Sequence, residues 1–258
     1  MGMIRNAAAC AVLAAAAAGA DEAPEAPGAI EAAQAQDAPA ASADLAEVLE
    51  RRLPDVNVTS VEASPIPGFL VVEIEGGVML HVTEDGSYAI AGVLYALTDQ
   101  GPVDPFKARW AARRLALLAD VPADQMIVFA PAGETRAVLN VFTDPDCGFC
   151  RKLHAEVPEL NSYGIEVRYL AFPRMGIGSE TYDRLVSAWC AEDPQDAITD
   201  LKLGRKIPSK SCQNPVAEHY EMGKVVGVEG TPTMVTADGE LIAGYVPAAQ
   251  LAQGLGLK

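Results

Sequence analysis

Between residues 44 and 97, one short helical pattern is followed by short runs in which apolar and polar residues alternate, as is typical of β-strands. A short helix is predicted over 44–53, with Leu45, Val48 and Leu49 on one side and Pro54 ending it. Turn signals then separate a series of β-rich runs, and Gly76-Gly77 and Asp85-Gly86 are typical of hairpins. The predicted strands are 57–63, 69–75, 78–83 and 88–97.

This helix and these strands form a small unit, 44–98, that barely fills a hydrophobic core. Because its strand edges are also available for pairing, we expect the unit to be a dimerisation domain. Asp104-Pro105 then marks a helix start. Phe106, Trp110 and Leu117 lie along this predicted helix, which ends near 119. We therefore assign 99–120 to a linker helix between two differently built halves.

The second half, 121–258, changes to longer apolar runs and helical repeats. The order is two strands, a helix, a strand, a long helical stretch, two strands and a last helix. The predicted elements are strands 126–130 and 136–142, helix 147–160, and strands 165–171, 233–236 and 241–245. This order describes a thioredoxin-like sheet with a helical insertion, so the fold class is α+β.

The first twenty residues have the pattern of a cleavable secretory signal. Arg5 precedes an Ala-rich run, and Ala18-Gly19-Ala20 offers a cleavage site. The alternatives are an Ala-rich helix kept in the mature protein and a lipoprotein anchor at Cys10. Residues 21–43, rich in Ala, Pro, Glu and Gln, are predicted to be a flexible leader.

The charge of the chain limits its partners. There are 19 Lys and Arg residues against 35 Asp and Glu residues, and cleavage after residue 20 removes Arg5. The mature chain would carry 18 − 35 = −17 charges. This excludes nucleic acid and anionic membrane surfaces as expected partners. The Ala-rich segment is also too short to anchor the chain, so no membrane insertion is expected.

Cys147-Gly148-Phe149-Cys150 is the strongest chemical signal in the sequence. It follows an apolar strand and opens a predicted helix, where free backbone N–H groups and the helix dipole favour a thiolate at Cys147. We expect Cys147 to be exposed and to attack disulfides, and Cys150 to be covered and to resolve the mixed disulfide. Asp144 and Asp146 supply a turn and a helix N-cap, but their charge opposes the thiolate.

Two other interpretations of this motif are a static disulfide and a metal clip. A disulfide across two residues constrains little chain, and a clip of Cys147, Cys150 and His154 lacks further ligands with zinc spacing. Redox exchange is therefore favoured, without metal or cofactor. His154 lies on the same helical face as Cys150, and packing there is favoured over a catalytic role.

The two remaining cysteines of the mature chain are Cys190 and Cys212. An even count in an exported chain suggests disulfide pairs, and a bridge here would contribute about 3 kcal/mol to stability. Two free buried thiols are the alternative. Farther along, Thr231-Pro232 precedes the strand 233–236. Sequence physics alone favours a trans bond there.

Several segments resemble the periplasmic disulfide isomerases of the DsbC family. They occur in order between 126 and 245, and together they are more specific than Cys-x-x-Cys alone. The matching segments are 141–144, Cys147 to His154, 167–174, Ala188-Trp189-Cys190, and 227–233. Phe149 departs from the pattern, because the family usually has Tyr at this position.

The resemblance implies a periplasmic homodimer joined through its N-terminal domains, with two thioredoxin-fold arms facing a cleft. Its substrates would be misfolded, disulfide-containing exported proteins, and a membrane thiol reductase of the DsbD type would keep it reduced. Cys147 would attack, Cys150 would resolve, and Thr231 and a cis Pro232 would bind substrate backbone. Cys190 would pair with Cys212.

The expected function is therefore disulfide isomerisation and reduction with associated chaperone activity. One alternative is a dithiol oxidase of the same fold, although Gly148-Phe149 supplies no cation that would favour a strong oxidant. The other is a holdase chaperone that needs no redox chemistry.

Overall fold

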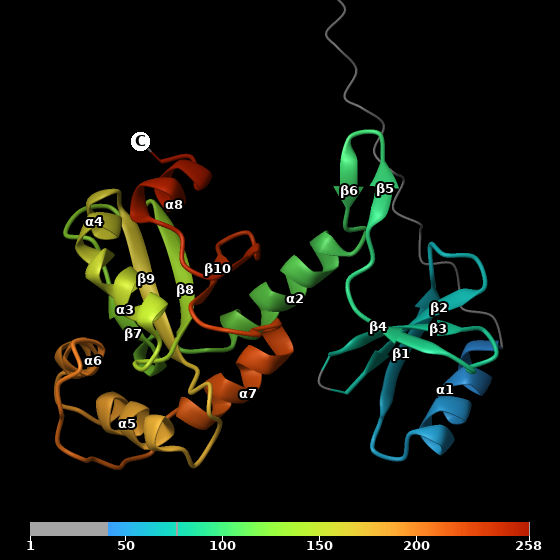
Figure 1. Ribbon diagram of the computed structural model, residues 1–258, viewed down its shortest axis with the longest axis horizontal. Coiled ribbons are helices and arrows are strands. Elements are labelled where there is room, and N and C mark those ends of the chain that lie inside the picture. Colours follow the sequence, from blue (N-terminus) through green and yellow to red (C-terminus); the bar gives the residue numbers. More distant parts are fainter. Residues whose placement is uncertain (1–40, 76, 258) are drawn as a thin grey trace, which may run out of the picture. The chain divides into compact units, whose positions relative to one another are not determined.

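We describe a computed structural model of the chain, which covers residues 41–75 and 77–257 (Figure 1). The expected signal peptide 1–20 and the leader up to residue 40 lie outside these residues. The first described part contains helix α1 (Ala41–Arg52) and a four-stranded antiparallel sheet in the order β1-β2-β3-β4. The strands are β1 (Val58–Ala63), β2 (Phe69–Ile74), β3 (Met79–Thr83) and β4 (Ala89–Ala91).

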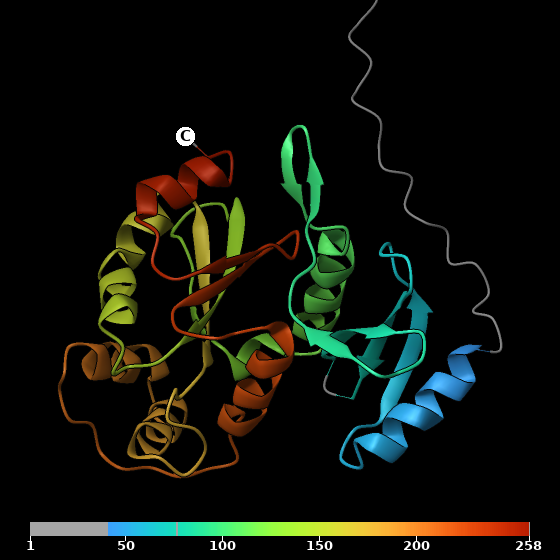
Figure 2. The same cartoon turned by 45° about the vertical axis from the view of Figure 1, so that its right-hand side comes forward.

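The core of this N-terminal part is small. Leu45 and Leu49, one turn apart on α1, pack against Val72 and Val82 of the sheet. Figure 2 shows α1 lying along the strands. The predicted helix and first three strands are thus present, and few apolar side chains hold them together.

The predicted strand over 88–97 is wrong, because the chain divides there. After β4 it forms a separate hairpin of β5 (Ala96–Thr98) and β6 (Gly101–Val103). Gly101 has φ +112°, a backbone conformation that side chains rarely adopt, at the turn of this hairpin. Alternation of side chains alone could not show where one strand ends and the next begins.

The linker range 99–120 is helical only in its second part. Helix α2 runs over Lys107–Ala119, after β6 and a turn in which Asp104 Oδ1 accepts the Phe106 N–H at 2.8 Å. Asp104 therefore caps a turn before the helix instead of the helix itself. Near the end of α2, Leu118 packs with Val226 in the core of the C-terminal domain.

The C-terminal domain is built on a five-stranded sheet in the order β11-β10-β8-β9-β7. The central strands β8 and β9 are parallel, and the other pairs are antiparallel. The strands are β7 (Ile127–Phe129), β8 (Ala137–Thr143), β9 (Ile165–Ala171), β10 (Thr233–Thr236) and β11 (Leu241–Ala243). Neighbouring parallel strands joined through helices, with antiparallel strands added, give the expected thioredoxin-like arrangement.

Both faces of this sheet are covered. Leu139 and Val141 of β8 contribute to one cluster, with Leu153 from the helix that follows. Phe142 contributes to the cluster on the opposite face, as the alternation of a strand requires. On that face a Cβ at Gly223 would lie 2.6 Å from the Phe172 ring, so only glycine permits this close approach.

The predicted helix over 147–160 is two helices. Helix α3 (Gly148–Ala155) ends at Glu156, and α4 (Val157–Ser162) begins with Pro158 in its first turn. Proline has no N–H to continue the helical ladder, which accounts for the break. The remaining helices are α5 (Glu180–Trp189), α6 (Pro194–Lys202), α7 (Val216–Val226) and α8 (Ala248–Gly254).

Helices α5 and α6 form the insertion between β9 and α7, and they lie together at one end of the domain in Figure 1. None of the helices in the described part of the chain has the length and apolar character that a membrane span requires.

Candidate active site

Cys147 lies where β8 gives way to α3, and it is itself the N-cap of the helix. Its φ and ψ of −81° and 119° are extended, and its sulfur accepts the backbone N–H of Cys150 at 3.4 Å. The sulfur also donates to the Thr231 carbonyl oxygen at 3.0 Å. The predicted Asp N-cap is therefore wrong. The sulfur itself occupies the position at which a helix stabilises negative charge.

The two aspartates before the dithiol are paired with arginines. Asp144 is buried and its carboxylate accepts the Asp146 N–H at 2.7 Å and both the backbone N–H and Nε–H of Arg174 at 3.0 Å. Asp146 pairs with Arg184. Their charges are thus compensated locally, so the expected opposition to a Cys147 thiolate is weaker than the sequence suggested.

Both thiols of the motif are buried, with Cys147 4% and Cys150 1% exposed. The expectation that exposure distinguishes Cys147 is therefore wrong. Burial raises the pKa of Cys147, but the Thr231 side chain and the backbone N–H groups of Cys150 and Phe149 outweigh it and leave the pKa below its ordinary value. Hydrogen bonding, rather than exposure, favours its thiolate.

Cys150 shows the opposite balance. Burial raises its pKa above the ordinary value, although the positive charge of Lys202, the backbone of Asp144 and the side chains of Thr231 and Thr143 act against this. Two thiols separated by two residues therefore differ in the direction in which their pKa values move. One is suited to attack from the thiolate form, and the other is held as a thiol.

The Thr231-Pro232 bond is cis, as the resemblance implies and in contrast to the trans bond favoured by sequence physics. β10 begins at the next residue, and its pairing of Thr233 with Phe142 places the preceding dipeptide beside the end of β8. The structure thus brings Cys147, Cys150 and Thr231 together from two distant segments.

A buried polar group lies behind the dithiol, and sequence reasoning missed most of it. Lys202 of α6 is 3% exposed, and its Nζ donates to Thr143 Oγ1 at 2.6 Å and lies 4.9 Å from the centre of the Tyr169 ring. A sequence signal did exist, because Lys202 continues the buried face of α6 formed by Ile198 and Leu201.

His154 belongs to the same group. Its Nδ1 lies 3.0 Å from the Tyr169 hydroxyl, and its Nε2 lies 3.0 Å from Thr199 Oγ1. Burial, with a smaller effect of the Lys202 charge, lowers the pKa of His154 to about 4. The ring is therefore neutral at pH 7 and occupied on both nitrogens, which fits the packing role expected for it.

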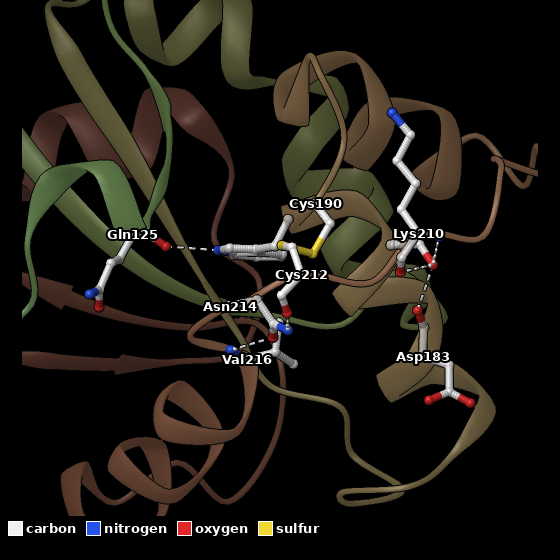
Figure 3. The surroundings of a disulfide bond; sticks show 9 residues. Gln125, Asp183, Cys190, Lys210, Cys212, Asn214 and Val216 are labelled. Atoms are coloured by element: carbon white, nitrogen blue, oxygen red, sulfur yellow. Dashed lines mark hydrogen bonds between the residues drawn. A yellow bond between two sulfur atoms is a disulfide. The ribbon is translucent and has the colours of Figure 1, made fainter.

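Cys190 and Cys212 are joined in a disulfide that connects the end of α5 to the loop before α7 (Figure 3). Cys190 is half-buried and Cys212 is exposed. The adjacent Trp189 donates its Nε1–H to the Gln125 carbonyl at 2.7 Å, and Asn214 Nδ2 donates to the Cys212 carbonyl at 2.8 Å. Hydrogen bonds next to both cysteines thus hold the segments that this disulfide joins.

Comparison with known proteins covers both parts of the chain. A family model described as "Thioredoxin-like domain" matches residues 122–257, and one described as "Disulfide bond isomerase protein N-terminal domain" matches 31–104. Among solved structures, a disulfide interchange protein from Neisseria gonorrhoeae aligns with a TM-score of 0.47 and 32% identity, over 53% of this chain and 96% of that one.

Curated relatives extend across both matches. The thiol:disulfide interchange protein DsbC of Haemophilus influenzae is 39% identical over 209 residues, which are 80% of this chain and 88% of that protein. DsbC of Escherichia coli strain K12 is 34% identical over 200 residues, or 78% of this chain and 82% of that protein. The chain therefore belongs to the DsbC family of thiol:disulfide interchange enzymes.

Proposed function

We propose that the chain is a periplasmic isomerase that reshuffles wrong disulfides in exported proteins, with Cys147 as nucleophile and Cys150 as resolving thiol. The observation that carries the proposal is the asymmetry of the two thiols. Hydrogen bonds lower the pKa of Cys147, whereas burial raises that of Cys150. A thiolate at the helix start attacks a substrate sulfur, and the second thiol frees the enzyme if the substrate does not rearrange.

Thr231 and Pro232 are proposed to hold the substrate backbone. The Thr231 carbonyl lies 3.0 Å from the Cys147 sulfur, so an extended chain paired with this residue would place its own sulfur beside the nucleophile. Such β-strand addition uses backbone hydrogen bonds and tolerates many sequences. This suits an enzyme that acts on many misfolded proteins.

Exposed apolar side chains favour an associated chaperone activity. Phe149, within the motif, is 63% exposed and stacks on Tyr245. Met175 and Ile177 are also exposed, and the neighbouring Arg174 ties their loop to Asp144 before the dithiol. Apolar patches of this kind mark surfaces that bind other proteins.

We propose that the N-terminal domain joins two copies of the chain. β4 is the end strand of its sheet, and all three of its residues are exposed. Tyr88, just before β4, and Ile90 within it present apolar side chains at this edge, and Leu97 of the separate β5–β6 hairpin is 87% exposed. An exposed apolar edge strand is a template for pairing, and a second copy of the same strand would cover it.

Reduction of a substrate leaves Cys147 and Cys150 oxidised, so continued activity requires two electrons per event. We propose that a membrane thiol reductase of the DsbD type supplies them. The signal sequence predicted at 1–20 would carry the enzyme out of the cytoplasm, beyond the reach of cytosolic thiol reductants.

The test is reactivation of a scrambled multi-disulfide enzyme in mildly reducing buffer. Wild type should restore activity, Cys147→Ser should act no better than buffer, and Cys150→Ser should retain part of the activity because only escape from mixed disulfides needs Cys150. A disulfide-free client measured in parallel reports holding alone. Equal reactivation by wild type and Cys147→Ser would contradict the isomerase and favour a redox-independent holdase. Net oxidation of a reduced client, without reshuffling of wrong disulfides, would favour a dithiol oxidase instead.

A further inference from the structure

Lys202 is a buried cation without a carboxylate partner. Within residues 41–75 and 77–257 it forms no salt bridge, and the one hydrogen bond of its ammonium goes to the Thr143 hydroxyl. A charge held in the interior without a counter-charge is costly, so a buried lysine needs either compensation or a function. The Tyr169 ring 4.9 Å away offers only a partial compensation.

Thr143 connects this lysine to the dithiol. It is the last residue of β8, and its hydroxyl accepts from Lys202 Nζ at 2.6 Å. The same side chain is among the groups that oppose the raised pKa of the buried Cys150 thiol. A hydroxyl that accepts from an ammonium retains its own hydrogen to donate to a thiolate. Thr143 therefore connects the lysine ammonium, which it contacts directly, with the thiol of Cys150, whose pKa it lowers.

We propose that Lys202 is a positioning residue for resolution: through the Thr143 hydroxyl it exchanges a proton with Cys150 and stabilises the Cys150 thiolate that attacks the mixed disulfide. This inference rests on the proposed roles of Cys147 and Cys150. It assigns a function to a residue from the helical insertion, far from the Cys-x-x-Cys motif in sequence.

The surroundings of Lys202 favour an exchangeable proton. The ionisable groups that face it are Cys147, Cys150, Arg151 and His154 at α3, Asp144 after β8, and Tyr169 on β9. Asp144 is paired with Arg174, and His154 is neutral at pH 7. Burial lowers the pKa of Lys202 to about 8, although Cys150 and the nearby acids oppose this, so the lysine titrates close to the working pH.

The resolving step exchanges the mixed disulfide for the Cys147–Cys150 disulfide. Cys150 Sγ–H gives its proton to the Thr143 oxygen while the Thr143 proton passes to neutral Lys202 Nζ. The Cys150 thiolate attacks Cys147 Sγ, the Cys147–Cys150 bond forms, and the bond between Cys147 and the substrate sulfur breaks. The electron pair leaves on the substrate sulfur, which takes a proton from water, and Lys202 returns its proton to water. The substrate sulfur is reduced and the enzyme dithiol is oxidised.

A stopped-flow reaction of the reduced enzyme with dithiodipyridine separates the two steps. Attack by Cys147 releases a first pyridinethione, and closure by Cys150 releases a second one. In Lys202→Met we expect the rate of the first phase to change less than about twofold. The second phase should slow about tenfold at pH 7, because its midpoint, the pH at which its rate is half-maximal, moves up by about one pH unit. Thr143→Val should shift the second phase in the same direction, since it removes the connecting hydroxyl and keeps the lysine.

Lys152→Met is the matched control, because it removes an exposed cation from α3, the helix that carries the dithiol, and should leave both phases unchanged. An unchanged second-phase midpoint in folded Lys202→Met overturns the proposal. If that variant does not fold, an unchanged midpoint in Thr143→Val overturns it instead. Absence of the first phase in wild type, or its survival in Cys147→Ser, would contradict the proposed function and not the role of Lys202.

Discussion

The two cysteine pairs of the C-terminal domain occupy contrasting surroundings. Cys147 and Cys150 are both buried, at a helix start where backbone N–H groups, Thr231 and a buried lysine surround their sulfurs. Cys190 and Cys212 are 22 residues apart, and Cys212 is exposed to solvent. The pair that is more accessible is thus the one that the structure joins.

This difference shows that exposure does not decide which pair exchanges. A dithiol is reactive when its surroundings stabilise the thiolate, because the thiolate is both the attacking and the leaving form. A bridge is retained when it closes a long loop and its thiols gain nothing on reduction.

The order of reduction gives the largest expected difference between the pairs. In glutathione buffers we expect Cys147–Cys150 to open while Cys190–Cys212 stays closed, with equilibrium constants that differ by roughly a thousandfold. Quenching with acid, alkylating and mapping the peptides by mass spectrometry measures both pairs in one sample. If exposure were decisive, the bridge at Cys212 would open first.

Removal of each pair should affect stability unequally. The double variant Cys190→Ala/Cys212→Ala should lose about 3 kcal/mol of unfolding free energy, because the unfolded chain regains the freedom of the open loop. Chemical denaturation gives the value. The matched control, Cys147→Ala/Cys150→Ala measured against reduced wild type, should lose less. Equal losses would mean that the bridge is no more structural than the dithiol.

A buried histidine beside the bridge should make stability depend on pH. The His219 ring packs against Trp189, its Nδ1 accepts the Ala171 N–H at 3.3 Å, and burial lowers its pKa to about 4. The unfolded chain binds a proton near pH 6.5 and the folded chain does not, so this stability is present above pH 6.5 and lost as pH falls toward 4.

His219→Gln, which keeps an acceptor, should remove this dependence. Between pH 7 and 4.5 we expect the wild type to lose about 2.5 kcal/mol more than the variant. Denaturation midpoints at several pH values measure the difference. Parallel pH curves for the two proteins would show that His219 is not held neutral in the fold.

Alkylation within the dithiol gives the smallest expected effect. Reduced protein pulsed with iodoacetamide at pH 7 should be labelled at Cys147 roughly tenfold faster than at Cys150, since the pKa of Cys147 lies below its ordinary value and that of Cys150 lies above it. Peptide mapping after short pulses measures the ratio. Comparable labelling of Cys147 and Cys150 would contradict the roles assigned to the two thiols.

Much of the fold was predictable because it depends on local patterns. The strand 165–171 and the strand 233–236 agree with β9 and β10, and the motif follows the predicted strand. Breaks inside predicted elements were missed. Pro158 gave a signal for the division of α3 from α4, whereas the end of β4 depends on pairing with a neighbouring strand, which sequence alternation does not record.

The site was predictable only where its residues are neighbours in sequence. Cys147 and Cys150 carry their own spacing signal, but Thr143, Tyr169 and Lys202 reach the dithiol through the folding of β8, β9 and α6. The environment of a thiol depends on such long-range packing. For that reason the sequence indicated the reacting atoms and not the cause of their different pKa values.

Trapping the covalent intermediate tests the central assignment most directly. Reduced Cys150→Ser enzyme, incubated with a scrambled disulfide client and quenched with acid, should accumulate a mixed disulfide because the resolving thiol is absent. Mass spectrometry should find every enzyme–client disulfide at Cys147 and should find Cys190–Cys212 intact. Client cysteines joined to Cys190 or Cys212, or the same yield of adduct in Cys147→Ser/Cys150→Ser, would contradict the account.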